Sequence, residues 1–205
     1  QVISLVDLKA RHQVCSDDVE QAVLSVLRSG HWIGGPVVTQ LEAEMATLMN
    51  RTHAVGVANG TDALELSLQA LGVGPGDEVI APAVSFFATV GAIRRVGASP
   101  VLVDIRSDLP LIDWTQVEQA RTPQTRAVIP VHLFGMDAGS IETDLAVVDD
   151  VAQAVGAIPA RGRGQLAAMS FYPTKVLSAA GDGGMVATDD PELARHIRVL
   201  GNHGA

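Results

Sequence analysis

Lys175 is the only charged side chain in a long uncharged stretch of the sequence, from Gly164 to Gly181. An amine held among apolar neighbours is poorly hydrated, which favours the neutral form that attacks aldehydes. The alternative is an ordinary lysine whose stem lies along the surface with its ammonium group in water. The sequence around Lys175 is therefore compatible with a reactive amine and with a plain surface lysine.

A carboxylate and an amide follow the apolar run at residues 145–149. Asp150 stands at the end of that expected strand, where a carboxylate can pair with a pyridinium nitrogen and keep it protonated. Gln153 comes three residues later, so a helix beginning here would place both side chains on one face. The alternative is that Asp149 or Asp150 merely caps this helix.

Three small residues are suited to binding a phosphate. Gly60 and Thr61 stand where an expected strand turns into a helix, a place where backbone N–H groups and a hydroxyl can face an anion. Thr61 as a plain helix N-cap is the alternative. Ser170, five residues before Lys175, is a further hydroxyl for this site. Phe86 follows a strand and could stack on an aromatic ring, although an aromatic residue at such a place commonly belongs to the core.

Composition excludes several classes of protein. The 205 residues carry a formal charge of −9, which disfavours nucleic-acid binding. A single cysteine, Cys15, excludes an internal disulfide framework and fits a cytoplasmic protein. The six histidines show no metal-ligand spacing, so we expect no metal site. We also expect no signal peptide and no membrane-spanning segment.

The elements that must position these residues alternate along the chain. Apolar, β-branched runs between amphipathic helices indicate an α/β fold with a mostly parallel sheet covered by helices on both faces. In such sheets ligands bind at the carboxyl ends of the strands. The expected strands are His53–Ala58, Glu78–Ala81, Pro100–Asp104, Ala127–Leu133, Leu145–Asp149 and Met185–Thr188, and the expected helices are Asp17–Arg28, Thr39–Met49, Asp62–Leu71, Phe87–Val96 and one ending at Ala154–Ala157.

With these positions assembled, the sequence resembles the DegT/StrS family, the PLP-dependent nucleotide-sugar aminotransferases of fold type I. The resemblance covers nearly the whole chain. The Asp-x-x-Gln pair and the Phe-Tyr-Pro-Thr-Lys block are its most specific motifs. The matching segments are Gly34–Pro36, Val57–Leu64, Gly74–Ile80, Pro130–Gly135, Asp150–Ala154, Ser170–Lys175, Gly181–Gly184 and Asn202–Gly204.

The resemblance implies a role for each residue that would face the cofactor ring. Lys175 would form the internal aldimine with PLP and then act as acid and base in the proton shift. Asp150 would bind the pyridine nitrogen, and Gln153 would approach the phenolic oxygen. Phe86 matches the family's stacking aromatic residue. Gly60, Thr61 and Ser170 match its phosphate contacts.

The implied reaction is a transamination in two halves. An amino donor, commonly glutamate, would convert PLP to PMP, which then aminates a keto-sugar carried on a nucleoside diphosphate. The resemblance also implies a homodimer, and it identifies residues 1–205 as the PLP-binding large domain without the smaller C-terminal domain of the family. The segment from Gly135 to Asp144 is short for the family's crossover, so we expect a reduced connection there.

Two alternatives remain beside the aminotransferase. The sugar dehydratases of the same family carry His at the lysine position, so Lys175 argues against that branch. The other alternative is a truncated, non-catalytic chain that keeps the fold and serves in assembly or binding.

Overall fold

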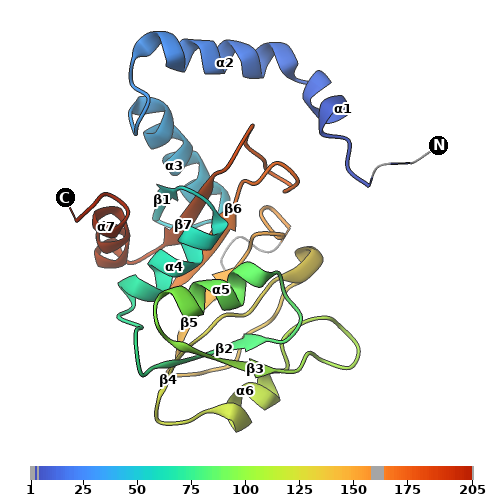
Figure 1. Ribbon diagram of the computed structural model, residues 1–205, viewed down its shortest axis with the longest axis vertical. Helices are drawn as coiled ribbons and strands as arrows, with labels where there is room; N and C mark the ends of the chain where they lie inside the picture. Colours follow the sequence, from blue (N-terminus) through green and yellow to red (C-terminus); the bar gives the residue numbers. More distant parts are fainter. Residues whose placement is uncertain (1–2, 4, 158–163, 205) are drawn as a thin grey trace.

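A computed structural model describes residue 3 and residues 5–157 and 164–204 of the chain. Within these residues, seven strands form one sheet in the order β1-β7-β6-β5-β4-β2-β3 (Figure 1). β7 is antiparallel to both of its neighbours, β1 and β6, and the other four strand pairs are parallel, so the sheet is mostly parallel. The strands are β1 His53–Val57, β2 Glu78–Pro82, β3 Ser99–Val103, β4 Thr125–Val128, β5 Ala146–Asp150, β6 Leu166–Ser170 and β7 Gly184–Thr188.

Helices cover both faces of this sheet, which confirms the predicted α/β architecture. Alternation along β6 illustrates the two layers. Leu166 and Ala168 pack in one hydrophobic cluster, whereas Ala167 and Met169 pack in another on the opposite face. The first face is covered by α4 (Gly60–Ala70), α5 (Phe87–Arg95) and α7 (Pro191–Leu200), and the second by α3 (Pro36–Leu48) and α6 (Trp114–Ala120).

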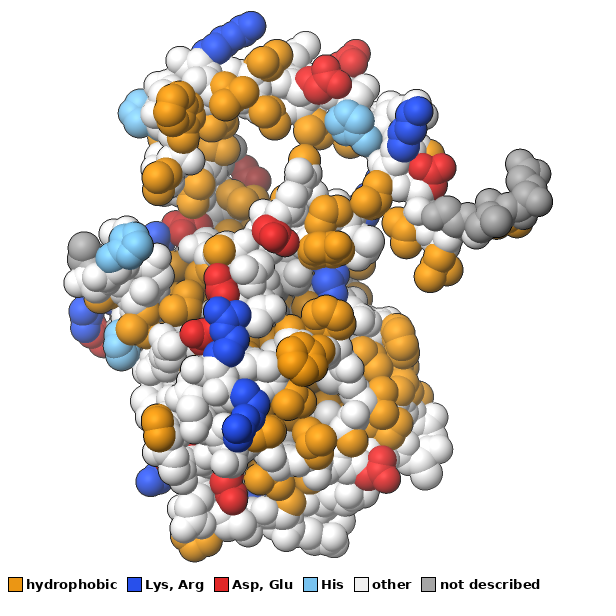
Figure 2. Space-filling model, in the orientation of Figure 1, with side chains coloured by type: hydrophobic (Ala, Val, Ile, Leu, Met, Phe, Trp, Pro, Cys, Tyr) orange, Lys and Arg blue, Asp and Glu red, His pale blue; other side chains and the backbone are white. Residues whose placement is uncertain are grey.

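The N-terminal helices α1 (Leu8–Gln13) and α2 (Ser16–Ser29) lie apart from the sheet (Figure 1). No residue of either helix is buried. Apolar side chains are therefore exposed along α2, as Figure 2 shows at the top of the molecule. Arg11 on α1 bonds the loop after β6: its guanidinium donates to the backbone carbonyls of Lys175 at 2.9 Å and Val176 at 2.8 Å.

Two expected elements are wrong in part. The strand predicted over Ala127–Leu133 ends at Val128, because Pro130 cannot donate a ladder hydrogen bond. Residues 151–157 form turns instead of a helix, with Gly156 in the left-handed region at φ 77°.

The connection between β4 and β5 is reduced, as the short Gly135–Asp144 segment predicts. Residues 129–145 are all described, and they contain one 3₁₀ turn, η1 (Leu133–Gly135), and no α-helix. Phe134 in this turn adopts a left-handed backbone conformation with φ 56°. This turn places the Phe134 N–H beside Gln153, close to the carboxyl end of β5 at Asp150.

Candidate active site

A cavity of about 510 Å³ opens at the carboxyl ends of β5 and β6. Helices α4 and α5 and the loop after β6 complete its wall. The structure brings together at this cavity every residue that the sequence singles out for chemistry: Gly60, Thr61, Phe86, Asp150, Gln153, Ser170 and Lys175.

Asp150 is the buried acid of this cavity, with only 7% of its surface exposed. Its Oδ1 accepts a hydrogen bond from the Ala152 N–H at 3.1 Å, and its Oδ2 accepts one from the Thr89 hydroxyl at 3.1 Å. Burial raises the pKa of Asp150, while these two hydrogen bonds and the positive charge of Lys175 oppose the rise. The Ala152 contact resembles a cap of the following turn, yet the carboxylate still faces the cavity.

The start of α4 meets the end of β6 at one corner of the cavity. Asn59 caps α4 by accepting the Asp62 N–H at 2.9 Å, so Thr61 is not the N-cap. The backbone approaches so closely here that a Cβ on Gly60 would lie 2.6 Å from the Cβ of Ser170. Only glycine therefore allows the first N–H groups of α4 to stand beside the Ser170 hydroxyl.

Lys175 lies half-buried in the loop that follows β6. Its N–H donates to the Tyr172 carbonyl at 2.8 Å, and its own carbonyl accepts from Arg11. Of its apolar sequence neighbours, Val176 and Leu177 are exposed, whereas Phe171 is buried. Lys175 itself lines the cavity, where its positive charge interacts with the carboxylate of Asp150.

Gln153 and Phe86 stand on two further parts of the wall. Gln153 accepts the Phe134 N–H through Oε1 at 2.8 Å, so its NH₂ group is the remaining donor at the cavity. A turn after β5, and not the helix predicted there, positions Gln153. Phe86 precedes the first residue of α5 and is 70% exposed, so it is a cavity-wall residue and not part of the core.

Sequence reasoning missed Thr89 and Ser85. Thr89 on α5 is completely buried and touches Asp150, and the Ser85 hydroxyl lies 2.7 Å from that of Thr89. One sequence feature could have indicated Thr89: it lies three residues after Phe86, on a helix that begins close to the end of a strand. Other cavity residues to which the sequence assigned no role include Leu64, Arg95, Tyr172, Thr174 and Asp182.

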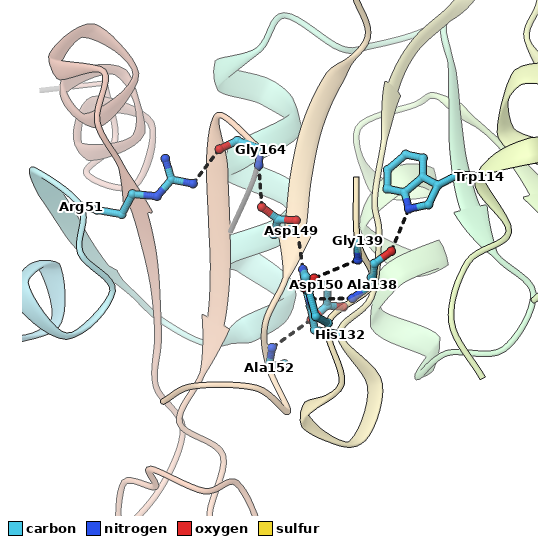
Figure 3. Close-up of polar contacts among 10 residues, drawn as sticks. Arg51, Trp114, His132, Ala138, Gly139, Asp149, Asp150, Ala152 and Gly164 are labelled. Atoms are coloured by element: carbon cyan, nitrogen blue, oxygen red, sulfur yellow. Dashed lines mark hydrogen bonds and ion pairs between the residues drawn. The ribbon is translucent and has the colours of Figure 1, made fainter. Parts of the chain in front are cut away.

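Behind Asp150, on the other face of the sheet, lies a second polar network (Figure 3). His132 accepts the Ala138 N–H through Nδ1 at 3.2 Å, which leaves its Nε2 to donate to Asp149 Oδ1 at 3.0 Å. Asp149 Oδ2 accepts the Gly164 N–H at 2.7 Å. These groups hold the connection after β4 against the end of β5.

No helix among the described residues has the length and apolar character needed to cross a bilayer. In that same part of the chain, no three His, Cys, Asp or Glu side chains gather in a way that could hold a metal ion.

The model of the DegT/DnrJ/EryC1/StrS aminotransferase family matches residues 14–205. The chain belongs to this family. It is 48% identical to the erythromycin biosynthesis sensory transduction protein EryC1 of Saccharopolyspora erythraea, across 99% of this chain and 58% of that protein. It is 45% identical to the dTDP-3-amino-3,4,6-trideoxy-alpha-D-glucose transaminase of Streptomyces venezuelae, across 99% of this chain and 56% of the relative.

Solved structures of the family confirm the predicted fold. The crystal structure of S. venezuelae DesV in complex with a ketimine intermediate has a TM-score of 0.91 and 42% identity, covering 99% of this chain and 58% of that one. Bacillus subtilis NtdA with bound PMP has a TM-score of 0.84 and 33% identity, covering 96% of this chain and 48% of that one. The chain thus spans less than two thirds of the length of these relatives.

Proposed function

We propose that this chain is the PLP-binding part of an aminotransferase that moves an amino group from an amino acid to a nucleotide-linked keto-sugar. The observation that carries the proposal is the gathering of an amine, a buried carboxylate, an amide and a helix start around one cavity. When bound, PLP supplies an electron sink that lets the amino group pass through its PMP form. Residues of the chain would bind and orient the cofactor and move the proton.

Each residue facing the cofactor ring would have a role that follows from its side-chain chemistry. Lys175 is the amine that attaches the cofactor and then accepts and returns a proton at Nζ. Asp150 is the buried carboxylate that pairs with the protonated ring nitrogen and keeps that positive charge in place. Gln153 presents its NH₂ group to the phenolic oxygen, and Phe86 covers a ring face with its side chain.

The phosphate would bind at the corner where α4 begins. The N–H groups of Gly60 and Thr61 stand at the positive end of the helix dipole, which favours a bound dianion. The hydroxyls of Thr61 and Ser170 add donors to the same corner. The absence of a Cβ on Gly60 leaves the room that this close approach requires.

The family relatives support the choice of substrate. The S. venezuelae relative is named as a transaminase of a dTDP-sugar, and an Acidithiobacillus ferrooxidans relative as one of a UDP-sugar. We therefore propose a nucleotide-linked keto-sugar as amino acceptor and glutamate as donor. We place residues 1–205 in the cofactor-binding large domain. A cytoplasmic location is proposed because Cys15 is the sole cysteine and is free and exposed.

We further propose that the protein works as a homodimer. Helix α2 has an apolar stripe with no buried residue, and Val23, Leu24 and Leu27 are all at least 44% exposed. A second copy seated on this surface would remove it from water. Sedimentation of the purified protein tests this: a monomer at micromolar concentration contradicts the proposal.

Reduction of the protein with borohydride after incubation with PLP tests the function directly. The chain has two lysines, Lys9 and Lys175, so peptide mass spectrometry distinguishes the two positions completely. We expect a stable pyridoxyl-phosphate group on Lys175 alone. Lys175→Ala should remove the adduct and abolish transamination, whereas Lys9→Ala, the matched control on α1, should change neither.

Two results would contradict the proposal. The first is a protein that acquires no pyridoxyl group at Lys175, which would favour the assembly or binding role. The second is a Lys175→Ala variant that retains turnover with glutamate and a keto-sugar nucleotide.

A further inference from the structure

Two hydroxyl groups connect the buried acid to the wall of the cavity. Thr89 on α5 has no exposed surface, and its Oγ1 donates to Asp150 Oδ2 at 3.1 Å. The Ser85 Oγ lies 2.7 Å from the same Thr89 oxygen, and Ser85 itself lines the cavity. The contact therefore runs from the cavity wall through a buried helix residue to the carboxylate.

The direction of these hydrogen bonds follows from the number of protons. A hydroxyl has one proton, and Thr89 gives its proton to Asp150. Ser85 must then be the donor in the contact with Thr89. Each bond polarises the next, so the Ser85 hydroxyl strengthens the hydrogen bond that Thr89 makes to the ionised carboxylate.

The contact of Thr89 is unusual for a hydroxyl on a helix. Such side chains commonly bond the carbonyl four residues earlier, as Ser67 on α4 does with the Ala63 carbonyl at 2.6 Å. Four residues before Thr89 is Ser85, and the contact is with its side chain rather than its carbonyl. The Thr89 hydroxyl is therefore directed at the carboxylate and not at its own helix.

We infer that Thr89 is a positioning residue for Asp150, with Ser85 behind it, and that this pair keeps Asp150 ionised and aimed at the ring nitrogen of the cofactor. The inference rests on the proposed function. It assigns to α5 a task beyond presenting Phe86. Because Asp150 is buried, a hydrogen bond to its charged form has a larger effect than the same bond in water.

The test compares PLP with an analogue in which CH replaces the ring nitrogen. Affinities are measured by spectroscopic titration of the cofactor-free protein. Thr89→Val keeps the shape and removes the hydroxyl, and we expect it to weaken PLP binding about tenfold or more. Its affinity for the analogue should equal that of the wild type, because the analogue offers Asp150 no nitrogen. Thr89→Ser should restore PLP affinity.

A matched control comes from β7. Thr188 is also a buried threonine, but its hydroxyl donates to the Gln165 carbonyl, at the opposite end of β6 from Ser170. Thr188→Val should bind PLP and the analogue as the wild type does. Ser85→Ala should weaken PLP binding by a smaller, few-fold factor, since Thr89 still contacts Asp150.

The outcomes separate this inference from the function on which it rests. If Thr89→Val weakens PLP and the analogue equally, or neither, the residue acts by packing alone and the inference is overturned. If the wild type itself binds PLP no better than the analogue, the pairing of Asp150 with the ring nitrogen fails first. A loss of PLP affinity in Thr89→Val that Thr89→Ser reverses and the analogue does not share supports the inference.

Discussion

Asp149 and Asp150 are adjacent at the end of β5, are both less than 10% exposed, and belong to different regions of the molecule. Successive side chains of a strand point to opposite faces of the sheet. Asp150 therefore faces the cavity under α4 and α5, whereas Asp149 faces the network of His132 behind the sheet. Residue type and burial are the same, so neither property explains which of the two can act on a ligand.

The donors around the two carboxylates explain the difference. Asp149 receives an imidazole N–H and a backbone N–H, from His132 and Gly164, and both donors are fixed in direction. Asp150 receives the Ala152 N–H and the Thr89 hydroxyl, which can rotate and can accept as well as donate. A carboxylate held by rigid donors is structural, whereas one with an adaptable partner and an open side can change its state.

The largest expected effect is on catalysis, in Asp150→Asn. The neutral amide can accept a hydrogen bond from the ring N–H but cannot balance its positive charge, so transamination should fall about 10²–10³-fold. The fold should survive, because the Thr89 hydroxyl can rotate to accept from the new NH₂ group. Single-turnover rates with glutamate, together with thermal unfolding, measure both parts. An active variant would remove the distinction drawn between the two carboxylates.

The same change at the neighbouring residue should act on stability. In Asp149→Asn the NH₂ group must oppose either the His132 N–H or the Gly164 N–H. His132 cannot switch its proton to Nδ1, because that atom accepts the Ala138 N–H. A buried, unpaired donor costs about 2 kcal/mol. We therefore expect the melting temperature to fall by about 4–8 °C.

Asp150→Asn is the matched control for this measurement, since it makes the same substitution one residue away. If Asp149→Asn melts at the wild-type temperature while Asp150→Asn melts well below it, the assignment of the two networks is reversed.

The sequence predicts the site better than it predicts the elements around it. All seven selected residues line one cavity, because each ends or follows a strand whose carboxyl end lies at the same edge of the sheet. Strand β6 was missed because Leu166–Ser170 contains no β-branched residue. Helices α1, α6 and α7 were also absent from the expected elements.

Contacts between distant segments were beyond the reach of local patterns. Nothing in the spacing of residues 89 and 150 indicates that Thr89 bonds Asp150, because the contact depends on how α5 packs on the sheet. The same holds for the Phe134 N–H that orients Gln153. The exposure of Val176 and Leu177 beside Lys175 is likewise not indicated by the apolar run in which they stand.

The smallest expected effect concerns the pH dependence of stability in the cofactor-free protein. Burial raises the pKa of Asp150, so the folded protein keeps this proton to a higher pH than the unfolded chain does. The wild type should therefore lose stability as pH rises from the ordinary aspartate range through the raised value, and no further above it. Asp150→Asn lacks this proton, so its free energy of unfolding relative to the wild type should increase over that interval and then level off. Urea denaturation of both proteins between pH 4 and pH 8 measures this difference. A difference that stays constant or shrinks with pH would mean that the charge of Asp150 is already fully compensated within the chain, as that of a purely structural carboxylate would be.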